Sequence, residues 1–228
     1  MSQPALGAVL YSTAIVALVA YPFGSIPSGV ILLKAFGKPD PRTVGSGNIG
    51  ATNVTRTGGK ALGAATLVLD VLKGFVPAFL IISLYPGMGG VAGLAGLVAV
   101  VGHCYPVWLR FKGGKGVATF LGAALATTWP VGPLAFVAVW VVVAFLTRFA
   151  SVASLAACWL TPAAVWVTVW ISRSTQVGID YSLYERGPAE GVALLLAAIL
   201  VTWRHRSNLG RLRRGEEPRM GAKTAAAS

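Results

Sequence analysis

The chain has 228 residues, of which 55% are hydrophobic and only 11% are charged. Soluble domains carry about a quarter charged residues, so this composition excludes a soluble protein and indicates one integral membrane domain. Nineteen Lys and Arg against seven Asp and Glu give a net charge of +12. An excess of basic residues in cytoplasmic loops explains that charge without a nucleic-acid partner, and so few carboxylates disfavour a magnesium site.

Seven apolar segments follow one another along the chain, and about 20 apolar residues suffice to cross a bilayer. They run over residues 5–33, 61–85, 89–109, 116–129, 131–147, 149–171 and 189–203. The first is long enough to span with a kink at Pro22 or Pro27, and it lacks the basic start of a signal peptide. The fourth and seventh are short, so five spans are the alternative to seven. The sequence predicts an all-α polytopic membrane protein.

Charge in the connections predicts the topology. The basic connections are residues 34–60, 110–115, 147–151 and the segment after 203, whereas "YPGMGG" and "TTWPVGP" carry no charge. Residues 172–190 set Arg173 and Arg186 against Asp180, Glu185 and Glu190. With seven spans, every basic connection lies on one side, which the positive-inside rule assigns to the cytoplasm. We expect the N-terminus outside and the C-terminus in the cytoplasm, with 1–217 as a single membrane domain and 218–228 as a flexible tail.

A first polar cluster, "VGSGNIGATNVTR" at residues 44–56, follows the first apolar segment. Its glycines are Gly45, Gly47 and Gly50, and its side-chain donors include Ser46, Thr52, Asn53 and Arg56. Such glycines allow backbone N–H groups to converge on an anion, and arginine presents a planar fork that matches phosphate. The next span starts soon after, so its N-terminus is expected to face the same anion. An ordinary connector is the alternative, but the density of donors favours an anion site.

A second cluster, "RFKGGKGVAT" at residues 110–119, repeats this pattern. Its glycines are Gly113, Gly114 and Gly116, its lysines are Lys112 and Lys115, and a helix is expected to follow. The spacing is not the GxxxxGK[ST] of a nucleotide-binding P-loop, which sets NTP hydrolysis aside. Basic anchoring at the cytoplasmic membrane surface is the alternative interpretation.

The third cluster, "WRHRSNLGRLRRGEE" at residues 203–217, follows the last apolar segment. On a helix, His205, Asn208, Leu209 and Leu212 share one face, which we expect to turn toward the protein. A plain basic helix against lipid head groups is the alternative. The inward pair of His205 and Asn208 favours a functional role.

Three further ionisable residues lie in the apolar segments. Asp70 and Lys73 are three residues apart in the second segment, where charges are costly and usually paired. We favour a structural ion pair for them and a structural role for His103. The three polar clusters together predict an anionic, phosphorylated substrate at the cytoplasmic surface.

Taken in order along most of the chain, four stretches resemble the bacterial acyl-phosphate:glycerol-3-phosphate acyltransferase family. They read "GSGNIGATNVTR", "DVLKG", "GHCYPVWLRFKGGKGVAT" and "HRSNLGRLRRGEE". The resemblance implies a seven-span enzyme of the bacterial inner membrane whose active site faces the cytoplasm. It would transfer a fatty acyl group from acyl phosphate to the 1-hydroxyl of sn-glycerol 3-phosphate, giving 1-acyl-glycerol 3-phosphate (lysophosphatidic acid) and phosphate, the first step of phospholipid synthesis. Neither acyl-CoA nor acyl carrier protein is the expected donor, and neither a cofactor nor a metal is expected.

The resemblance also implies roles for residues. We expect five catalytic residues that bind glycerol 3-phosphate and orient its hydroxyl: Ser46, Arg56, Lys115, His205 and Asn208. The backbones of 45–50 and 113–116 are expected to hold the acyl phosphate head group. The remaining substrate-binding residues are expected to be Gly45, Gly47, Asn48, Gly50, Thr52, Asn53, Lys112, Gly113, Gly114 and Gly116.

Neither histidine is followed five residues later by Asp, so the sequence lacks a His-x4-Asp dyad for proton transfer. An acyl phosphate is already activated, and positioning with charge neutralisation supplies most of what the reaction needs. A phosphate oxygen, which titrates at about pH 6 in phosphorylated side chains, is the expected proton acceptor. His205 stays open as a general base or a binding residue.

Three other classes of protein compete with an acyltransferase. A transporter or channel for organic phosphates also needs basic loops, but its spans carry polar groups, and these spans are nearly bare beyond Asp70 and Lys73. An alcohol-phosphatidyltransferase relies on an Asp-rich metal site that the sequence lacks. A purely structural membrane protein would leave the three clusters unexplained.

Overall fold

The computed structural model describes residues 6–85, 87–175 and 187–221, and every regular element in these ranges is a helix. The helices are α1 (Leu6–Ser25), α2 (Ser28–Ala35), α3 (Ala51–Gly58), α4 (Lys60–Leu84), α5 (Gly89–Cys104), the 3-10 turn η1 (Val107–Leu109), α6 (Val117–Thr127), α7 (Val131–Thr147), α8 (Ala150–Thr175), α10 (Gly187–Arg204) and α11 (Arg206–Arg213). The predicted all-α class is confirmed. The predicted domain limits stay a prediction, and residues 222–228 of the expected tail lie outside the described residues, as do Asp180, Glu185 and Arg186.

Four helical stretches in the described ranges are long and apolar enough to cross a membrane. They cover Val16–Ala35, Lys60–Leu84, Gly89–Leu109 and Ala150–Ser174. Helices α6 and α7 are apolar but shorter. The chain is therefore a multi-pass membrane protein by helix length and composition, whereas seven spans and the orientation of the termini stay predictions.

The first apolar segment is broken rather than gently bent. Pro22 lies inside α1, while α1 ends at Ser25 and α2 begins directly after Pro27. Proline lacks the N–H that a continuous helix needs, which explains why the segment divides there. Of the two predicted kink points, Pro27 lies at the break and precedes α2, whereas α1 continues through Pro22.

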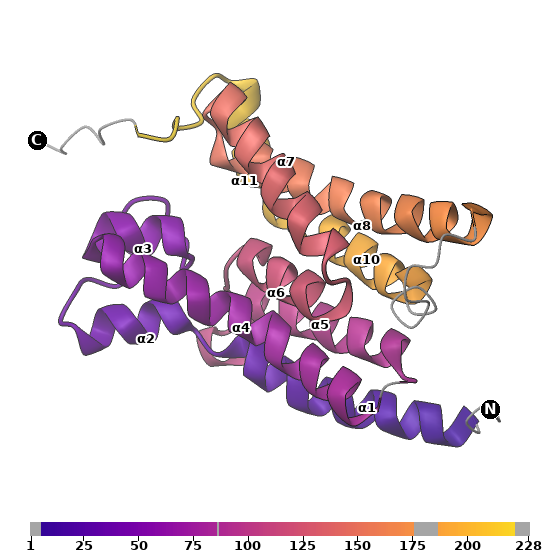
Figure 1. Ribbon diagram of the computed structural model, residues 1–228. Helices are drawn as coiled ribbons and strands as arrows, with labels where there is room; N and C mark the ends of the chain where they lie inside the picture. The colour runs from indigo at the N-terminus through magenta and orange to yellow at the C-terminus, as the bar shows by residue number, and fades with distance from the viewer. Residues whose placement is uncertain (1–5, 86, 176–186, 222–228) are drawn as a thin grey trace, which may run out of the picture.

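The helices pack into two groups that α10 joins (Figure 1). Helix α4 packs on α5 and α6, α1 packs on α5, and α7 pairs with α8, while α10 contacts both α5 and α8. Small residues permit the closest approach: a Cβ on Gly74 of α4 would overlap the Thr119 carbonyl oxygen of α6, and a Cβ on Gly122 would overlap that of Val71. Close backbone contact of this kind replaces the hydrophobic driving force that lipid removes.

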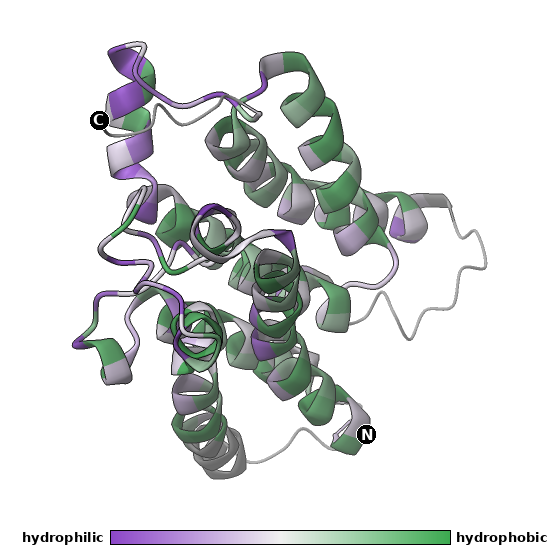
Figure 2. Cartoon of the chain, turned by 90° about the vertical axis from the view of Figure 1, so that its left-hand side faces the viewer, coloured by the Kyte–Doolittle hydropathy of each residue, from purple (hydrophilic) through white to green (hydrophobic). Residues whose placement is uncertain are grey.

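The outside of the bundle is apolar, as lipid contact requires. Phe145 is 83% exposed and Leu18 is 74% exposed, and Figure 2 shows the helices largely in green. Purple gathers instead on α11, beside the C-terminal label, and on nearby loops. The polar clusters therefore lie apart from the apolar flanks of the bundle.

An ion pair lies inside the bundle. Lys73 Nζ is 2.6 Å from Asp70 Oδ1, and both side chains are buried. His103 Nδ1 approaches the same carboxylate oxygen at 3.7 Å. The pairing agrees with the structural interpretation that the sequence favours for Asp70 and Lys73. Glu190, expected in a connection, instead lies buried in the first turn of α10.

Candidate active site

The first polar cluster folds into a loop and a short helix. Gly45 and Gly47 have φ values of +61° and +68°, a region that glycine enters without steric strain. The loop leads to Gly50, which precedes α3. Helix α3 ends before Gly59, which has a φ of +95°, and the apolar helix α4 begins at Lys60. The expectation that a span starts soon after the loop is confirmed, but the helix that starts directly at the loop is α3.

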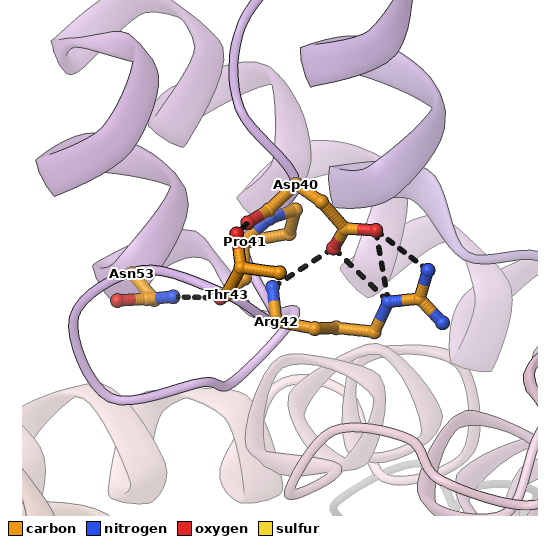
Figure 3. A network of polar contacts seen from close by, with 5 residues as sticks. All are labelled: Asp40, Pro41, Arg42, Thr43 and Asn53. Atoms are coloured by element: carbon orange, nitrogen blue, oxygen red, sulfur yellow. Dashed lines mark hydrogen bonds and ion pairs between the residues drawn. The ribbon is translucent and has the colours of Figure 1, made fainter.

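Asn53, on the first turn of α3, holds this loop together (Figure 3). Its Nδ2 donates to the Pro41 carbonyl oxygen at 2.7 Å. The same Nδ2 donates to the Val44 carbonyl oxygen at 3.0 Å, and Oδ1 accepts from the Ser46 N–H at 3.0 Å. The residue is 1% exposed, so these bonds form where water does not compete. Both amide hydrogens of Asn53, expected to serve the substrate, are engaged in shaping the loop.

Several backbone donors of the first loop are also engaged. The Gly47 N–H donates to the Val44 carbonyl at 3.2 Å, and the Gly50 N–H donates to Asn48 Oδ1 at 3.1 Å. The Ser46 N–H bonds to Asn53, as described above. Fewer backbone N–H groups are thus available to an anion than the glycine pattern predicts.

Exposed side chains provide the remaining polar groups of this cluster. Ser46, Thr52 and Arg56 are all exposed. Arg42, just before the loop, is bound instead to the Asp40 carboxylate, and this hydrogen bonding lowers the pKa of Asp40 (Figure 3). Both arginines are exposed, and they differ in that the Arg42 guanidinium is held by the Asp40 carboxylate.

The second cluster forms a loop over residues 112–116, between η1 and α6, and the end of α5 holds one side of it. The Gly113 N–H donates to the Cys104 carbonyl at 3.2 Å, and the Gly114 N–H donates to the His103 carbonyl at 3.0 Å. A Cβ on Gly114 would overlap Nε2 of the His103 ring. Gly116, with φ of +84°, leads into α6. These two N–H groups, expected to face acyl phosphate, face α5 instead.

Arg204, the last residue of α10, holds the other side of the second loop. Its Nη2 donates to the Gly113 carbonyl at 2.7 Å and its Nε donates to the Gly114 carbonyl at 3.0 Å. This contact brings the second and third clusters together. The exposed Lys112 begins the loop, and Lys115 follows the two glycines.

In the third cluster, His205 stands at the junction of α10 and α11 and is 2% exposed. Its Nδ1 lies 2.8 Å from the Val201 carbonyl oxygen. Because a carbonyl oxygen only accepts, Nδ1 carries the ring proton. Burial, and next the charge of Lys115, lower the pKa of His205 to about 4. The ring is therefore neutral at pH 7 and its Nε2 is an acceptor.

Glu217 ties the third cluster to α8. Its Oε1 accepts from Asn208 Nδ2 at 2.6 Å and Ser151 Oγ at 2.7 Å, and its Oε2 accepts from Arg211 Nε at 2.9 Å. Burial raises the pKa of Glu217, but these hydrogen bonds outweigh it and lower the pKa below its ordinary value. The Asn208 Nδ2 group thus donates to the Glu217 carboxylate. The other amide atom, Oδ1, is buried and has no hydrogen-bond partner within the described ranges.

The pKa of Lys115, in the second cluster, responds to charged groups of the first and third clusters. Burial lowers the pKa of Lys115 to about 8, and the charges of Arg56, Arg204 and Arg211 lower it as well, while Glu217 raises it. Arg56 comes from the first cluster and the other three residues from the end of the chain. The site is thus dominated by positive charge. In the part of the chain that the structure describes, no three His, Cys, Asp or Glu side chains gather as a metal site.

Sequence reasoning placed the clusters but missed their supports. His205 and Asn208 are buried on the predicted face, with Leu209 and Leu212 half-buried. The supports that it missed are Arg204, Ser151, Arg211 and Glu217. Glu216 and Glu217 are the two acids among the basic residues of the third cluster, and their rarity was a usable signal. Nothing local distinguishes the other three.

Comparison with known proteins identifies the family. The family model for glycerol-3-phosphate acyltransferase matches residues 14–215. Glycerol-3-phosphate acyltransferases of Rhodospirillum rubrum and Erythrobacter litoralis are 48% and 46% identical to the chain over 217 and 209 residues. Each alignment covers 92% of this chain, and they cover 92% and 95% of the two relatives.

Solved structures share the fold. The crystal structure of PlsY, an integral membrane glycerol 3-phosphate acyltransferase, in its glycerol 3-phosphate form superposes with a TM-score of 0.77 at 37% identity. Its lysophosphatidic acid form gives 0.76 at 35% identity, and both alignments cover 92% of this chain and 96% of the other. The chain therefore belongs to the glycerol-3-phosphate acyltransferase family and is an integral membrane acyltransferase of lipid biosynthesis.

Proposed function

We propose that this enzyme transfers a fatty acyl group from acyl phosphate to the 1-hydroxyl of sn-glycerol 3-phosphate, giving 1-acyl-glycerol 3-phosphate and phosphate. The observation that carries the proposal is that Arg204 bonds the third cluster to the loop that holds Lys115. The charges of Arg56, Arg204 and Arg211 also lower the pKa of Lys115. Two phosphate-bearing substrates bring several negative charges together. A site rich in arginine and lysine offsets that repulsion.

The donor itself supplies much of the reactivity. The hydroxyl oxygen attacks the acyl carbonyl carbon, a C–O bond forms, and the bond from that carbon to the phosphate oxygen breaks. The hydroxyl proton passes to the departing phosphate, whose oxygens titrate at about pH 6 in phosphate esters. Positioning and charge neutralisation are then the main tasks of the protein. The proposal includes neither acyl-CoA nor acyl carrier protein as donor.

We assign binding roles to five residues. Arg56 and Lys115 neutralise phosphate, Ser46 hydrogen-bonds to it, and His205 and Asn208 orient the glycerol hydroxyl. The buried Asn208 Oδ1 without a partner supports this assignment, because an acceptor of this kind is costly until it receives a hydrogen bond. The exposure of Ser46 and Arg56 is compatible with direct contact.

For His205, the structure favours hydrogen bonding over proton abstraction. A general base works best with a pKa near the working pH, whereas the pKa of His205 is about 4. Its Nε2 accepts a hydrogen bond from the hydroxyl and fixes the direction of attack. A His205→Ala variant that keeps about a tenth of the wild-type kcat supports this role, whereas a fall of more than about 10³-fold indicates an essential base.

We also propose seven spans in the bacterial inner membrane, with the N-terminus outside and the active site in the cytoplasm. The positions of the basic connections support this topology. Two exposed positions test it, because Gly87 joins α4 to α5 and Ser207 lies in α11. In intact cells, an impermeant maleimide should label Gly87→Cys but not Ser207→Cys. The reverse labelling pattern would show the opposite topology. The native Cys104 and Cys158 are buried, so they should contribute little background labelling.

The reaction is tested with purified protein, palmitoyl phosphate and glycerol 3-phosphate, without added metal. Phosphate release and lysophosphatidic acid are followed together. Wild-type protein should form both in equal amounts, and Arg56→Ala should abolish both. Arg213→Ala is the matched control because Arg213 is an exposed arginine of α11, and its activity should match that of wild type.

Other outcomes point to the competing functions. Phosphate without lysophosphatidic acid would identify a hydrolase. Absence of both products, with counterflow of glycerol 3-phosphate in proteoliposomes, would favour a transporter. Activity that EDTA removes and Mg²⁺ restores would contradict a metal-independent mechanism.

A further inference from the structure

Arg204 makes an unusual pair of contacts for a basic residue at the end of an apolar helix. Both donors described above reach backbone carbonyls of the second loop, at 2.7 Å to Gly113 and 3.0 Å to Gly114. The guanidinium thus bonds to a segment 90 residues earlier in the chain. Its Nε and Nη2 are directed at the protein rather than at a ligand.

An aromatic ring fixes the same guanidinium through its face. Arg204 Cζ lies 5.0 Å from the centroid of the Tyr105 ring, within the range of a cation–π contact. The carbonyl of Tyr105 accepts a hydrogen bond from Tyr21 Oη at 2.7 Å, which ties this residue to α1. A planar fork held at its edge and on its face is a geometry that lysine cannot reproduce.

The second loop is consequently held from two sides. The N–H groups of Gly113 and Gly114 bond to carbonyls at the end of α5, and the carbonyls of the same residues bond to Arg204. Lys115 is the next residue. The orientation of both glycine peptides therefore determines where the backbone delivers the Lys115 side chain.

We propose that Arg204 is a positioning residue for the acyltransferase reaction: it fixes the second loop so that Lys115 meets substrate phosphate. The inference rests on the proposed function and extends it to a residue that acts through the loop rather than through substrate contact. It predicts a defect in phosphate binding when the fork is lost, even when the positive charge is kept.

Arg206 provides a matched control. It lies two residues further on, carries the same charge, and is exposed. Its guanidinium stacks on the Trp203 ring at 5.2 Å and donates to the Trp203 carbonyl at 3.4 Å. These contacts stay within its own segment, so Arg206 shares the charge of Arg204 but not the link to the second loop.

The experiment compares Arg204→Lys with Arg206→Lys in purified protein. Arg204→Lys should raise KM for glycerol 3-phosphate by about tenfold, as expected when two charge-assisted hydrogen bonds weaken. Its kcat should change by less than about threefold, since the reacting groups remain. Arg206→Lys should leave both parameters within about twofold of wild type.

Three results would overturn the proposal: KM unchanged in Arg204→Lys, an equal rise in KM in both variants, or a loss confined to kcat. Loss of activity with a fall in Tm of more than about 5 °C would assign Arg204 to folding instead. If Arg204→Lys does not fold, Tyr105→Leu is used, because it frees the guanidinium face while Arg204 remains. A KM within about twofold of wild type in that variant would also contradict the proposal.

Calorimetric binding of glycerol 3-phosphate separates this inference from the proposed reaction. Binding does not require turnover, so a tenfold weaker affinity in Arg204→Lys supports the positioning role even if no lysophosphatidic acid is formed. Unchanged affinity in a protein that does make lysophosphatidic acid would reject the positioning role and keep the reaction.

Discussion

The first and second loops are both rich in glycine, yet they are held in opposite ways. Asn53 supports the first loop from within the same segment, bonding to residues 7 to 12 positions away. The second loop depends on the end of α5 and on Arg204, 90 residues further along. Local closure costs little chain entropy, whereas long-range contacts require the bundle to be assembled first. The hydrogen bonds that shape the first loop are therefore local, whereas those that shape the second loop form only when α5 and α10 are packed beside it.

The largest expected effect tests the local support of the first loop. Asn53→Ala leaves two carbonyls and one N–H without their partner, at a cost of about 3 kcal/mol. If that cost falls on the loop, kcat/KM should fall by about 100-fold, with helix content and Tm little changed.

Thr57→Ala is the matched control for Asn53→Ala, because its hydroxyl donates within α3 to the Asn53 carbonyl at 2.9 Å. Its activity should stay within about twofold of wild type. An equal loss in both variants would mean that α3, rather than the Asn53 amide, supports the loop.

A smaller effect is expected at the second loop from Gly114→Ala, whose new methyl group would overlap the His103 ring. Overpacking costs about 1–3 kcal/mol, so kcat/KM should fall by roughly 10- to 100-fold. Gly87→Ala, with no atom near the added methyl group, should behave as wild type. Full activity in Gly114→Ala would show that the loop tolerates displacement from α5.

The pH dependence of kcat/KM tests the charge of Lys115 in the second loop. Lys115, with a pKa of about 8, is charged below that pH and neutral above it. For a single ionisation, kcat/KM should fall about tenfold per pH unit above pH 8. Lys115→Arg should remove this decline, because arginine stays charged throughout. A decline that persists in Lys115→Arg would assign the ionisation to another group.

The smallest effect is expected from Glu217→Gln, which keeps the shape but loses the charge at the third cluster. Charge-assisted hydrogen bonds are about twice as strong as neutral ones, so weaker docking to Ser151 and Arg211 should reduce kcat/KM by about fivefold. In wild type, the lowered pKa of Glu217 contributes stability above its ordinary pKa, and this is lost as pH falls through the folded pKa. Glu216→Gln, at a more exposed acid, should change neither activity nor acid stability.

The difference between local and long-range contacts explains which helices and site residues could be predicted from the sequence. Long apolar runs predicted α4, α5, α7 and α8 because the length and hydropathy of such runs can be read directly from the sequence. Helix α3 was missed because it has only eight residues, five of them Thr, Asn or Arg, and lies between Gly50 and Gly59. Glycine and phosphate chemistry located both loops. Arg204 was missed because its role depends on α10 packing on α5, and no local pattern separates it from neighbouring arginines.

The ion pair within α4 bears on how the protein enters its membrane. Asp70 and Lys73 lie one turn apart on the same helix and bond at 2.6 Å. Two separate charges in mid-bilayer cost several kcal/mol, but a pair within one helix passes through as a unit without net charge. The pairing of Asp70 therefore requires no other helix, and His103 of α5 adds its contact at 3.7 Å where α5 packs on α4.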